Sequence, residues 1–238
     1  MICFLTSNPF LPDGGIDPAN GFFDCLLAAV RQPARLLFVC SSPDDPARTD
    51  HYAAAIRGSL ERAGVSPASF AVLDRRTADH AAALVADADL LILAGGHVPT
   101  QNRFFAQIGL RELLRGWDGV LVGISARSMN SAETVYAQPE EPGEAIDPGY
   151  RRFLPGLGLT KTMLLPHYQA IRGDVLDGLR VIEDITCPDS MGRTFYAIVD
   201  GSYLLIRGGA EELRGEAYRI RDGEIRQICA VGESVRLK

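Results

Sequence analysis

A serine stands in this sequence where an apolar run meets a helical pattern. Residues 119–123, Gly-Val-Leu-Val-Gly, have the composition of a buried strand, and residues 126–138 have the spacing of a helix. A sharp turn between strand and helix pushes a hydroxyl out of the sheet, and the first amides of the helix point at any oxyanion formed nearby. Ser125 is therefore predicted to lie on a nucleophile elbow. The usual elbow has glycine two places after the serine, where this chain has Arg127.

A serine nucleophile needs a base, and the four histidines are the candidates. Two of them lie in polar helical segments and are expected in solvent, namely His51 and His80. His167 follows the apolar residues 163–166 and so ends a strand, at the edge where open α/β sheets build their sites. On position His167 is the preferred base, and His97, which follows Gly95–Gly96, is the alternative.

The glycine pair Gly95–Gly96 also ends a predicted strand. Glycines there let the backbone approach a ligand, and one of their amides can donate to an oxyanion. The alternative is a tight turn without a function. The strand before Ser125 is the next one in the sequence, so the two strand ends can be neighbours.

The acid that orients the base is left open by the residues themselves. The glutamates that follow the serine within a short span are Glu133, Glu140, Glu141 and Glu144. Glu133 lies within the helical pattern and is expected to be solvated or to cap the helix. Glu140 and Glu141 lie in the polar loop past it, from which an acid could swing toward a histidine at the same sheet edge.

Composition indicates an ordinary globular chain. It has 238 residues, of which 47% are hydrophobic and 23% charged, enough for one substantial core. No linker or internal repeat divides it, so residues 1–238 are expected to form one domain. The 24 basic and 30 acidic residues give a net charge of -6, and scattered basic residues do not indicate a nucleic-acid surface.

The cysteines and the N-terminus indicate a cytoplasmic protein. Five cysteines without metal or redox spacing are expected to be reduced and mostly buried. The N-terminal residues read as a first strand rather than a signal peptide, and no apolar run reaches membrane-spanning length. We expect no metal or organic cofactor.

Apolar runs alternate with helical patterns along the first part of the chain. The predicted strands are residues 2–6, 35–40, 69–73, 89–94, 119–124, 161–166, 195–200, 203–207, 216–220 and 224–229. The predicted helices are residues 21–30, 50–63, 77–86, 101–115, 126–138 and 174–185. This alternation predicts a three-layer α/β/α fold with a mostly parallel central sheet.

The C-terminal third is expected to add antiparallel strands at the sheet edge. Asp200-Gly201 and Asp222-Gly223 are hairpin signals between its short strands. Such an edge extension could offer a surface for a homodimer.

Three motifs together make the chain resemble the S51 serine peptidases, which include aspartyl dipeptidases (peptidase E) and cyanophycinases. They are Leu93-Ala94-Gly95-Gly96-His97, Gly123-Ile124-Ser125-Ala126 and Leu165-Pro166-His167-Tyr168. The resemblance runs from about residue 89 to residue 201. It implies a fold like that of class I glutamine amidotransferases, which is also flavodoxin-like.

The resemblance also implies site roles and a substrate class. Ser125 would be the nucleophile and His167 the base, with the amides of Gly96 and Ala126 as the oxyanion hole. Glu140 falls at the matching distance for the acid of the triad. The substrate would be a small peptide, cleaved through an acyl-enzyme.

Two departures from the family pattern bear on specificity. Arg127, in place of the elbow glycine, could distort the turn or bind a substrate carboxylate. The longer turn after Gly96 places His97 in the substrate pocket and reshapes it, so aspartyl specificity is not assumed. For a substrate with an N-terminal aspartate, Arg127 and Arg193 are the candidate cations.

Other classes of function fit less well. A catalytically silent relative would bind a small ligand or a protein partner at the same cleft, and Arg127 is the main support for that alternative. A glutamine amidotransferase would have cysteine at the elbow. A dinucleotide-binding enzyme would have a G-x-G-x-x-G turn after the first strand, which this chain lacks.

Overall fold

The computed structural model describes residues 1–237, and its main feature is an eight-stranded mixed sheet. Five parallel strands form one part of this sheet, in the order β1 (Ile2–Thr6), β5 (Val120–Ile124), β4 (Leu90–Leu93), β2 (Ala34–Val39) and β3 (Pro67–Leu73). Beyond β1 the sheet continues antiparallel through β12 (Tyr203–Arg207), β13 (Ala210–Arg214) and β16 (Ser234–Leu237). The expected mostly parallel sheet with antiparallel C-terminal strands is confirmed.

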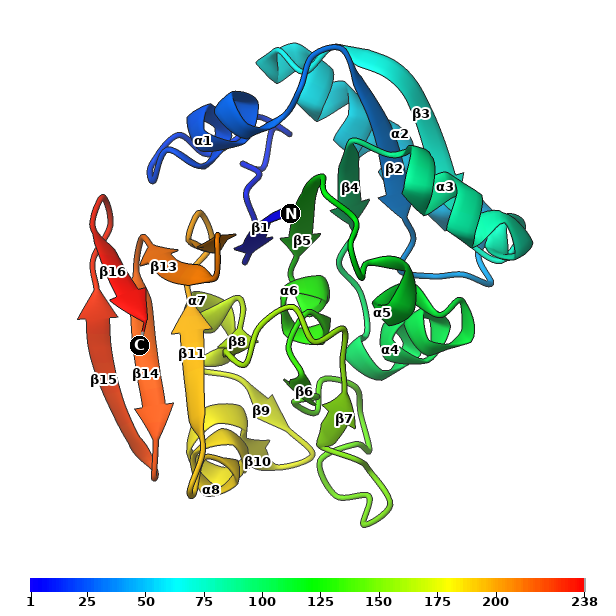
Figure 1. Ribbon diagram of the computed structural model, residues 1–238. Coiled ribbons are helices and arrows are strands. Elements are labelled where there is room, and N and C mark those ends of the chain that lie inside the picture. The colour runs from blue at the N-terminus through cyan, green and yellow to red at the C-terminus, as the bar shows by residue number, and fades with distance from the viewer. Residues whose placement is uncertain (238) are drawn as a thin grey trace.

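Helices cover the parallel part of the sheet (Figure 1). They are α1 (Phe22–Ala29), α2 (Pro46–Ala63), a 3₁₀ turn at Ala78–His80 with α3 (Ala81–Asp87), α4 (Val98–Gln107) and α5 (Leu110–Leu113). Strands β4 and β5 are buried along their whole length, as expected for parallel strands covered on both faces. No helix within residues 1–237 has both the length and the apolar character needed to cross a membrane.

A second sheet lies beside the first (Figure 1). Its strands, in spatial order, are β15 (Glu224–Cys229), β14 (Ala217–Arg221), β11 (Thr194–Ile198) and β8 (Met163–Leu165). Strands β8 and β11 run parallel, so the residues that follow them emerge at the same edge. The packing of Tyr136 on Phe195, with ring centroids 4.3 Å apart, ties this sheet to the segment after Ser125.

Short elements occupy the stretch of chain between β5 and β11. They are α6 (Ala126–Asn130), β6 (Thr134–Tyr136) paired with β7 (Phe153–Pro155), α7 (Tyr168–Ile171), the hairpin β9 (Val175–Leu176) and β10 (Leu179–Arg180), a π-helical turn Val181–Thr186 and α8 (Cys187–Asp189).

Two predicted helices are shorter than expected or absent. The helix predicted over 126–138 ends at Asn130, because the next residues pair with β7 and bury Val135 and Tyr136. The segment 174–185, predicted as a helix, begins instead with the hairpin of β9 and β10. Its turn is Asp177-Gly178, with φ values of 52° and 82°, and Asp-Gly is a favoured hairpin turn.

The two Asp-Gly hairpin predictions had different outcomes. Asp222-Gly223 joins the antiparallel pair β14 and β15, as predicted. Asp200-Gly201 does not form a hairpin, because β11 and β12 belong to different sheets. The chain crosses from one sheet to the other at this point.

Candidate active site

Ser125 lies at the end of β5 in a strained backbone conformation. Its φ and ψ are 57° and -124°, which few residues other than glycine adopt. The Ser125 amide donates to the carbonyls of Thr6 at 3.0 Å and Ser7 at 2.9 Å, which follow one another at the end of the neighbouring strand β1. These bonds hold the turn in the geometry that the sequence predicted for a nucleophile elbow.

His167 lies beside this serine. Its Nε2 is 2.7 Å from Ser125 Oγ. The residue has φ 58°, and its amide donates to Ser7 Oγ at 2.8 Å. The ring of His167 is thus fixed by backbone geometry at the end of β8, and the structure brings together the two residues that the sequence pairs.

Asp200 contacts the other ring nitrogen of His167. Its Oδ1 lies 2.8 Å from Nδ1 and also accepts a bond of 2.6 Å from Ser7 Oγ. Burial acts to raise the pKa of Asp200, but the bonds from His167 and Ser7 outweigh it and lower that pKa below its ordinary value. Asp200 is therefore ionised near neutral pH, and with the proton on Nδ1 the free Nε2 can accept from Ser125.

Glu140, expected as the acid of the triad, occupies another position. Its Oε1 accepts from the amide of Val98 at 3.0 Å, and Asp200 takes the place beside His167. The topology explains why Asp200 rather than Glu140 lies beside His167. Strands β8 and β11 are parallel neighbours, so the residues after them, His167 and Asp200, meet at one edge. Desolvation raises the pKa of Glu140 above its ordinary value.

His97, the alternative base, contacts neither Ser125 nor Asp200 through its ring nitrogens. Its Nε2 bonds Glu144 at 2.8 Å and its Nδ1 bonds Thr100 Oγ1 at 2.8 Å. His97, Glu141 and Glu144 bring potential metal-ligand atoms within 4.8 Å of one another. Glu144 already accepts from His97 through one carboxylate oxygen and from the amides of Glu140 and Glu141 through the other.

Two backbone amides are available near Ser125. Within residues 1–237, neither Gly96 nor Ala126 donates its amide hydrogen to a backbone acceptor in a turn or loop. Gly96 has φ 153°, and a Cβ there would lie 2.6 Å from both Gln101 Nε2 and Ser41 Cβ. Only glycine fits this position without displacing its neighbours.

Arg127 does not enter the site. Its side chain is fully buried, its Nη1 donates to the Val39 carbonyl at 3.1 Å, and its guanidinium also donates to Gln101 Oε1 and to the Cys40 carbonyl. It lies 4.7 Å from the centroid of the Phe105 ring. Burial lowers the pKa of Arg127 to about 9, which leaves it protonated at pH 7. The residue that replaces the elbow glycine thus ties α6 to the ends of β2 and α4.

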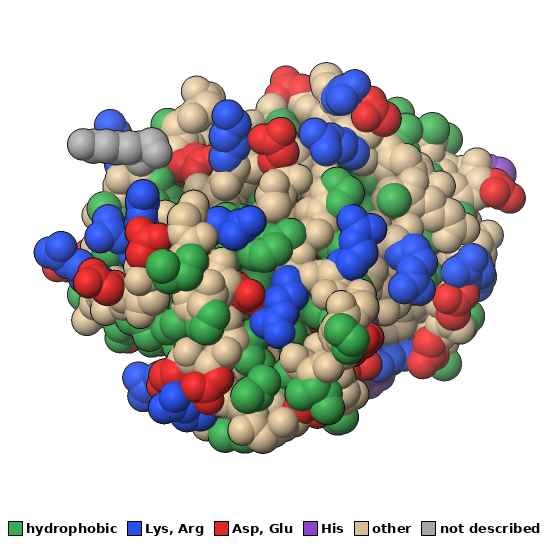
Figure 2. Space-filling model, turned by 90° about the horizontal axis from the view of Figure 1, so that it is seen from below, with side chains coloured by type: hydrophobic (Ala, Val, Ile, Leu, Met, Phe, Trp, Pro, Cys, Tyr) green, Lys and Arg blue, Asp and Glu red, His purple; other side chains and the backbone are tan. Residues whose placement is uncertain are grey.

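Arg193, the other cation proposed for substrate, is also elsewhere. It is exposed and stacks over Phe153, with 4.3 Å between its guanidinium and the ring centroid. It lines neither cavity beside Ser125. On the face seen in Figure 2, basic side chains alternate with acidic and apolar ones rather than forming one patch.

Two cavities meet at Ser125 and His167 and share no other lining residue within residues 1–237. One, of about 270 Å³, has Ala126, Met129 and Glu140 in its wall. The other, of about 530 Å³, has Gly96 and Tyr52. Ser125 and His167 line both, so a molecule bound across the serine would place one part in each cavity.

The fold and this array define an α/β protein of the hydrolytic kind, with a serine, a histidine and an aspartate at the ends of its strands. The chain belongs to peptidase family S51, whose sequence pattern matches residues 17–214. No curated protein matches the sequence significantly.

Two solved structures share the fold. A peptidase from an acI-B1 Actinobacterium superposes with a TM-score of 0.70 at 19% identity, covering 99% of this chain and 96% of that one. A putative peptidase E protein from Listeria monocytogenes EGD-e superposes with a TM-score of 0.60 at 14% identity, covering 95% of this chain and 98% of that one.

Proposed function

We propose that this peptidase is of the serine type and cleaves small peptides, including dipeptides, through an acyl-enzyme. The observation that carries the proposal is the continuous chain of contacts from Ser125 Oγ through both ring nitrogens of His167 to Asp200. Membership of family S51 supports peptides as the substrate class.

In the first half of the reaction, Ser125 Oγ attacks the carbonyl carbon of the scissile peptide bond. His167 Nε2 takes the hydroxyl proton, and Asp200 stabilises the imidazolium that results. The carbonyl oxygen becomes an oxyanion, and the amides of Gly96 and Ala126 donate to it. The C–N bond then breaks, and the proton on Nε2 passes to the leaving amine.

In the second half, water attacks the ester carbonyl of acyl-Ser125 and gives a proton to His167 Nε2. The bond from carbon to Ser125 Oγ breaks, the product leaves with a carboxyl group, and Nε2 returns the proton to the serine. Every atom that this cycle needs comes from the peptide, water and the side chains named above.

Labelling with a fluorophosphonate probe tests the mechanism. We expect the wild-type protein and His80→Ala, which alters an exposed histidine outside both cavity linings, to label at Ser125. Ser125→Ala and His167→Ala should not label. Absence of labelling in folded wild-type protein would overturn the proposal and favour a silent relative that binds a ligand at the same cleft.

A further inference from the structure

The two cavities that meet at Ser125 differ in charge. Among the described residues that line the smaller cavity, the side chains charged at neutral pH are Glu140 and Asp174, with no lysine or arginine. Among those that line the larger cavity, the only such side chain is Arg48. His167 lies at the boundary of both. The charge of the lining therefore changes from negative in the smaller cavity to positive in the larger one, with Ser125 between them.

Glu140 can accept a cation in the smaller cavity. One of its oxygens accepts from the Val98 amide, which orients the carboxylate and leaves the other oxygen without a protein donor within residues 1–237. Glu140 is exposed to solvent, and among its charged neighbours Glu141 and Glu144 add negative potential while His97 opposes them. Asp174, exposed in the loop that follows α7, lines the same cavity and has no side-chain hydrogen bond within that range.

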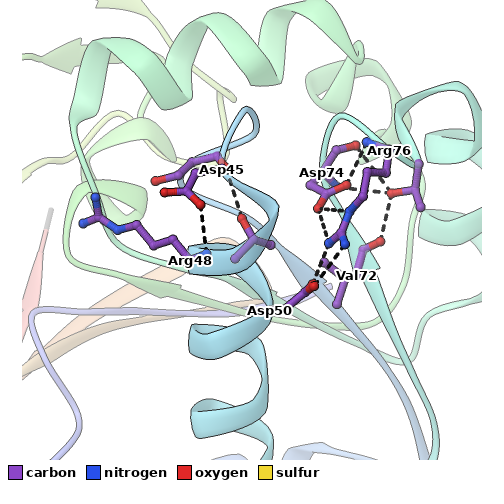
Figure 3. A network of polar contacts seen from close by, with 9 residues as sticks. Asp45, Arg48, Asp50, Val72, Asp74 and Arg76 are labelled. Carbon is purple, nitrogen blue, oxygen red and sulfur yellow. Dashed lines mark hydrogen bonds and ion pairs between the residues drawn. The ribbon is translucent and has the colours of Figure 1, made fainter.

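In the larger cavity, Arg48 can pair with an anionic group of a ligand. It forms no ion pair with an acidic side chain within residues 1–237, and its guanidinium lies over Tyr52, 5.7 Å from the ring centroid. Its amide donates to Asp45, the residue that caps α2. Its side chain extends away from Asp74 and Arg76 in Figure 3.

Ion pairs of Arg76 tie the helix that carries Arg48 to the end of β3. Arg76 bonds Asp74 at the end of β3 and Asp50 in the second turn of α2, with both carboxylates contacted through its Nη2 (Figure 3). Asp74 is fully buried, which fixes this clamp against the sheet. The same helix supplies Tyr52 and Ile56 to the cavity wall. Arg48 is therefore an exposed side chain on a helix that is tied to the sheet.

We propose that Glu140 and Asp174 bind the free α-ammonium group of a peptide, and that Arg48 binds its free carboxylate on the other side of Ser125. This inference rests on the proposed function and adds a direction to it. In a peptide the ammonium end lies on the acyl side of the scissile bond. The smaller cavity then holds the N-terminal residue, and the larger one the C-terminal residue released as the amine.

The linings set the side chains that each cavity accepts. Met129, Leu165 and Ile171 line the smaller cavity, so an aliphatic first residue buries apolar surface there. An aspartate in that position would place a second carboxylate near Glu140 and Asp174 without a cation to pair it. Phe10, Tyr52 and Ile56 line the larger cavity and favour an aromatic second residue. Leu-Phe should therefore bind better than Asp-Phe.

Binding to the Ser125→Ala protein tests the inference without requiring turnover. Calorimetry with Leu-Phe, N-acetyl-Leu-Phe, Leu-Phe amide and Asp-Phe would measure what each charged end contributes. We expect acetylation and amidation each to weaken binding at least tenfold, which corresponds to about 1.4 kcal/mol. Asp-Phe should also bind more weakly than Leu-Phe.

Variants in the same background assign each effect to a residue. Glu140→Gln should reduce the effect of acetylation to less than threefold and leave that of amidation unchanged. Arg48→Met should do the reverse. Glu133→Gln, at an exposed glutamate outside both cavity linings, and Arg57→Met, on the same helix as Arg48, are the matched controls and should change neither effect.

Three results would overturn the inference. The first is that the blocked peptides bind as tightly as Leu-Phe. The second is that Leu-Phe shows no binding at millimolar concentration. The third is that Glu140→Gln and Arg48→Met weaken all four ligands equally. Probe labelling of Ser125 remains a separate readout, so failure of the charge polarity and failure of the serine mechanism are distinguishable.

Discussion

The Ser7 hydroxyl donates a bond of 2.6 Å to Asp200 across 193 positions of sequence. The same oxygen accepts from the His167 amide at 2.8 Å, and the Ser7 carbonyl accepts from the Ser125 amide at 2.9 Å. One residue at the end of β1 therefore contacts all three members of the proposed triad. It sets their relative positions although it takes no part in proton transfer.

Ser7→Ala should lower kcat about tenfold, since a hydrogen bond to a charged acceptor contributes about 1.5–3 kcal/mol and part of it is recovered by water. KM should change little because Ser7 lines neither cavity. Steady-state kinetics on Leu-Phe would measure the split. Ser42→Ala, a serine outside the array, is the matched control, and an unchanged kcat in Ser7→Ala would contradict the role.

Asp200→Asn should have a far larger effect than Glu140→Gln. The amide cannot stabilise the imidazolium and favours the wrong tautomer of His167, for which a loss of about 10⁴-fold in kcat is expected. Glu140→Gln should act mainly through binding of the ammonium end. A comparison of kcat for the two variants decides between the two acids, and a loss of kcat in Glu140→Gln as large as that in Asp200→Asn would overturn the assignment.

The sequence predicts those site residues whose positions are marked by local patterns. Ser125, Gly96 and His167 each follow an apolar run, so the rule that strand ends meet at one edge was enough to bring them together. Asp200 was missed because Asp200-Gly201 has the composition of a hairpin turn. Its role depends on β11 pairing with β8 in a second sheet, which local sequence does not encode.

The remaining differences also arise from long-range packing. Ser7 carries no motif. Its importance comes from the parallel pairing of β1 with β5, which places Ser7 beside Ser125. Arg127 could equally have entered the pocket or lain beneath it, because the choice depends on carbonyls of Val39 and Cys40, far away in sequence. The helix pattern after Asn130 gave way to strand pairing with β7.

Gly96→Ala should reduce kcat by about 10²-fold, the effect of removing one oxyanion donor. The added Cβ would clash with Gln101 and Ser41 and displace the amide. Gly116→Ala is a suitable control, because Gly116 also has a positive φ (77°) but its Cβ would meet nothing within 4 Å. Kinetics and thermal unfolding of both variants would separate the effect on catalysis from backbone strain. Equal kcat in the two variants would argue against the oxyanion role.

Arg127→Gly, which restores the usual elbow residue, should destabilise the protein rather than raise its activity. The change removes a fully buried side chain and leaves the Cys40 carbonyl without its donor, whereas the Val39 carbonyl keeps the amide of Ala94. We expect the free energy of unfolding to fall by about 3–5 kcal/mol. Urea unfolding would measure this loss. Arg57→Gly, at an exposed helical position, is the control and should cost about 1 kcal/mol. A more active and equally stable Arg127→Gly protein would show that the arginine obstructs the site.

The ion pair between Arg35 and Asp89 should make stability depend on pH in the acid range. Hydrogen bonds from Arg35, at 2.9 Å to both carboxylate oxygens, lower the pKa of Asp89 to about 2 from its ordinary 3.8. A depressed folded-state pKa stabilises the protein above about pH 4, and this contribution is lost as the pH falls from 4 to 2. Because the pair is partly exposed, we expect Asp89→Asn to cost about 1 kcal/mol at pH 7. The difference from wild type in urea unfolding should shrink toward zero near pH 2, whereas a constant difference would mean that the aspartate acts through packing rather than charge.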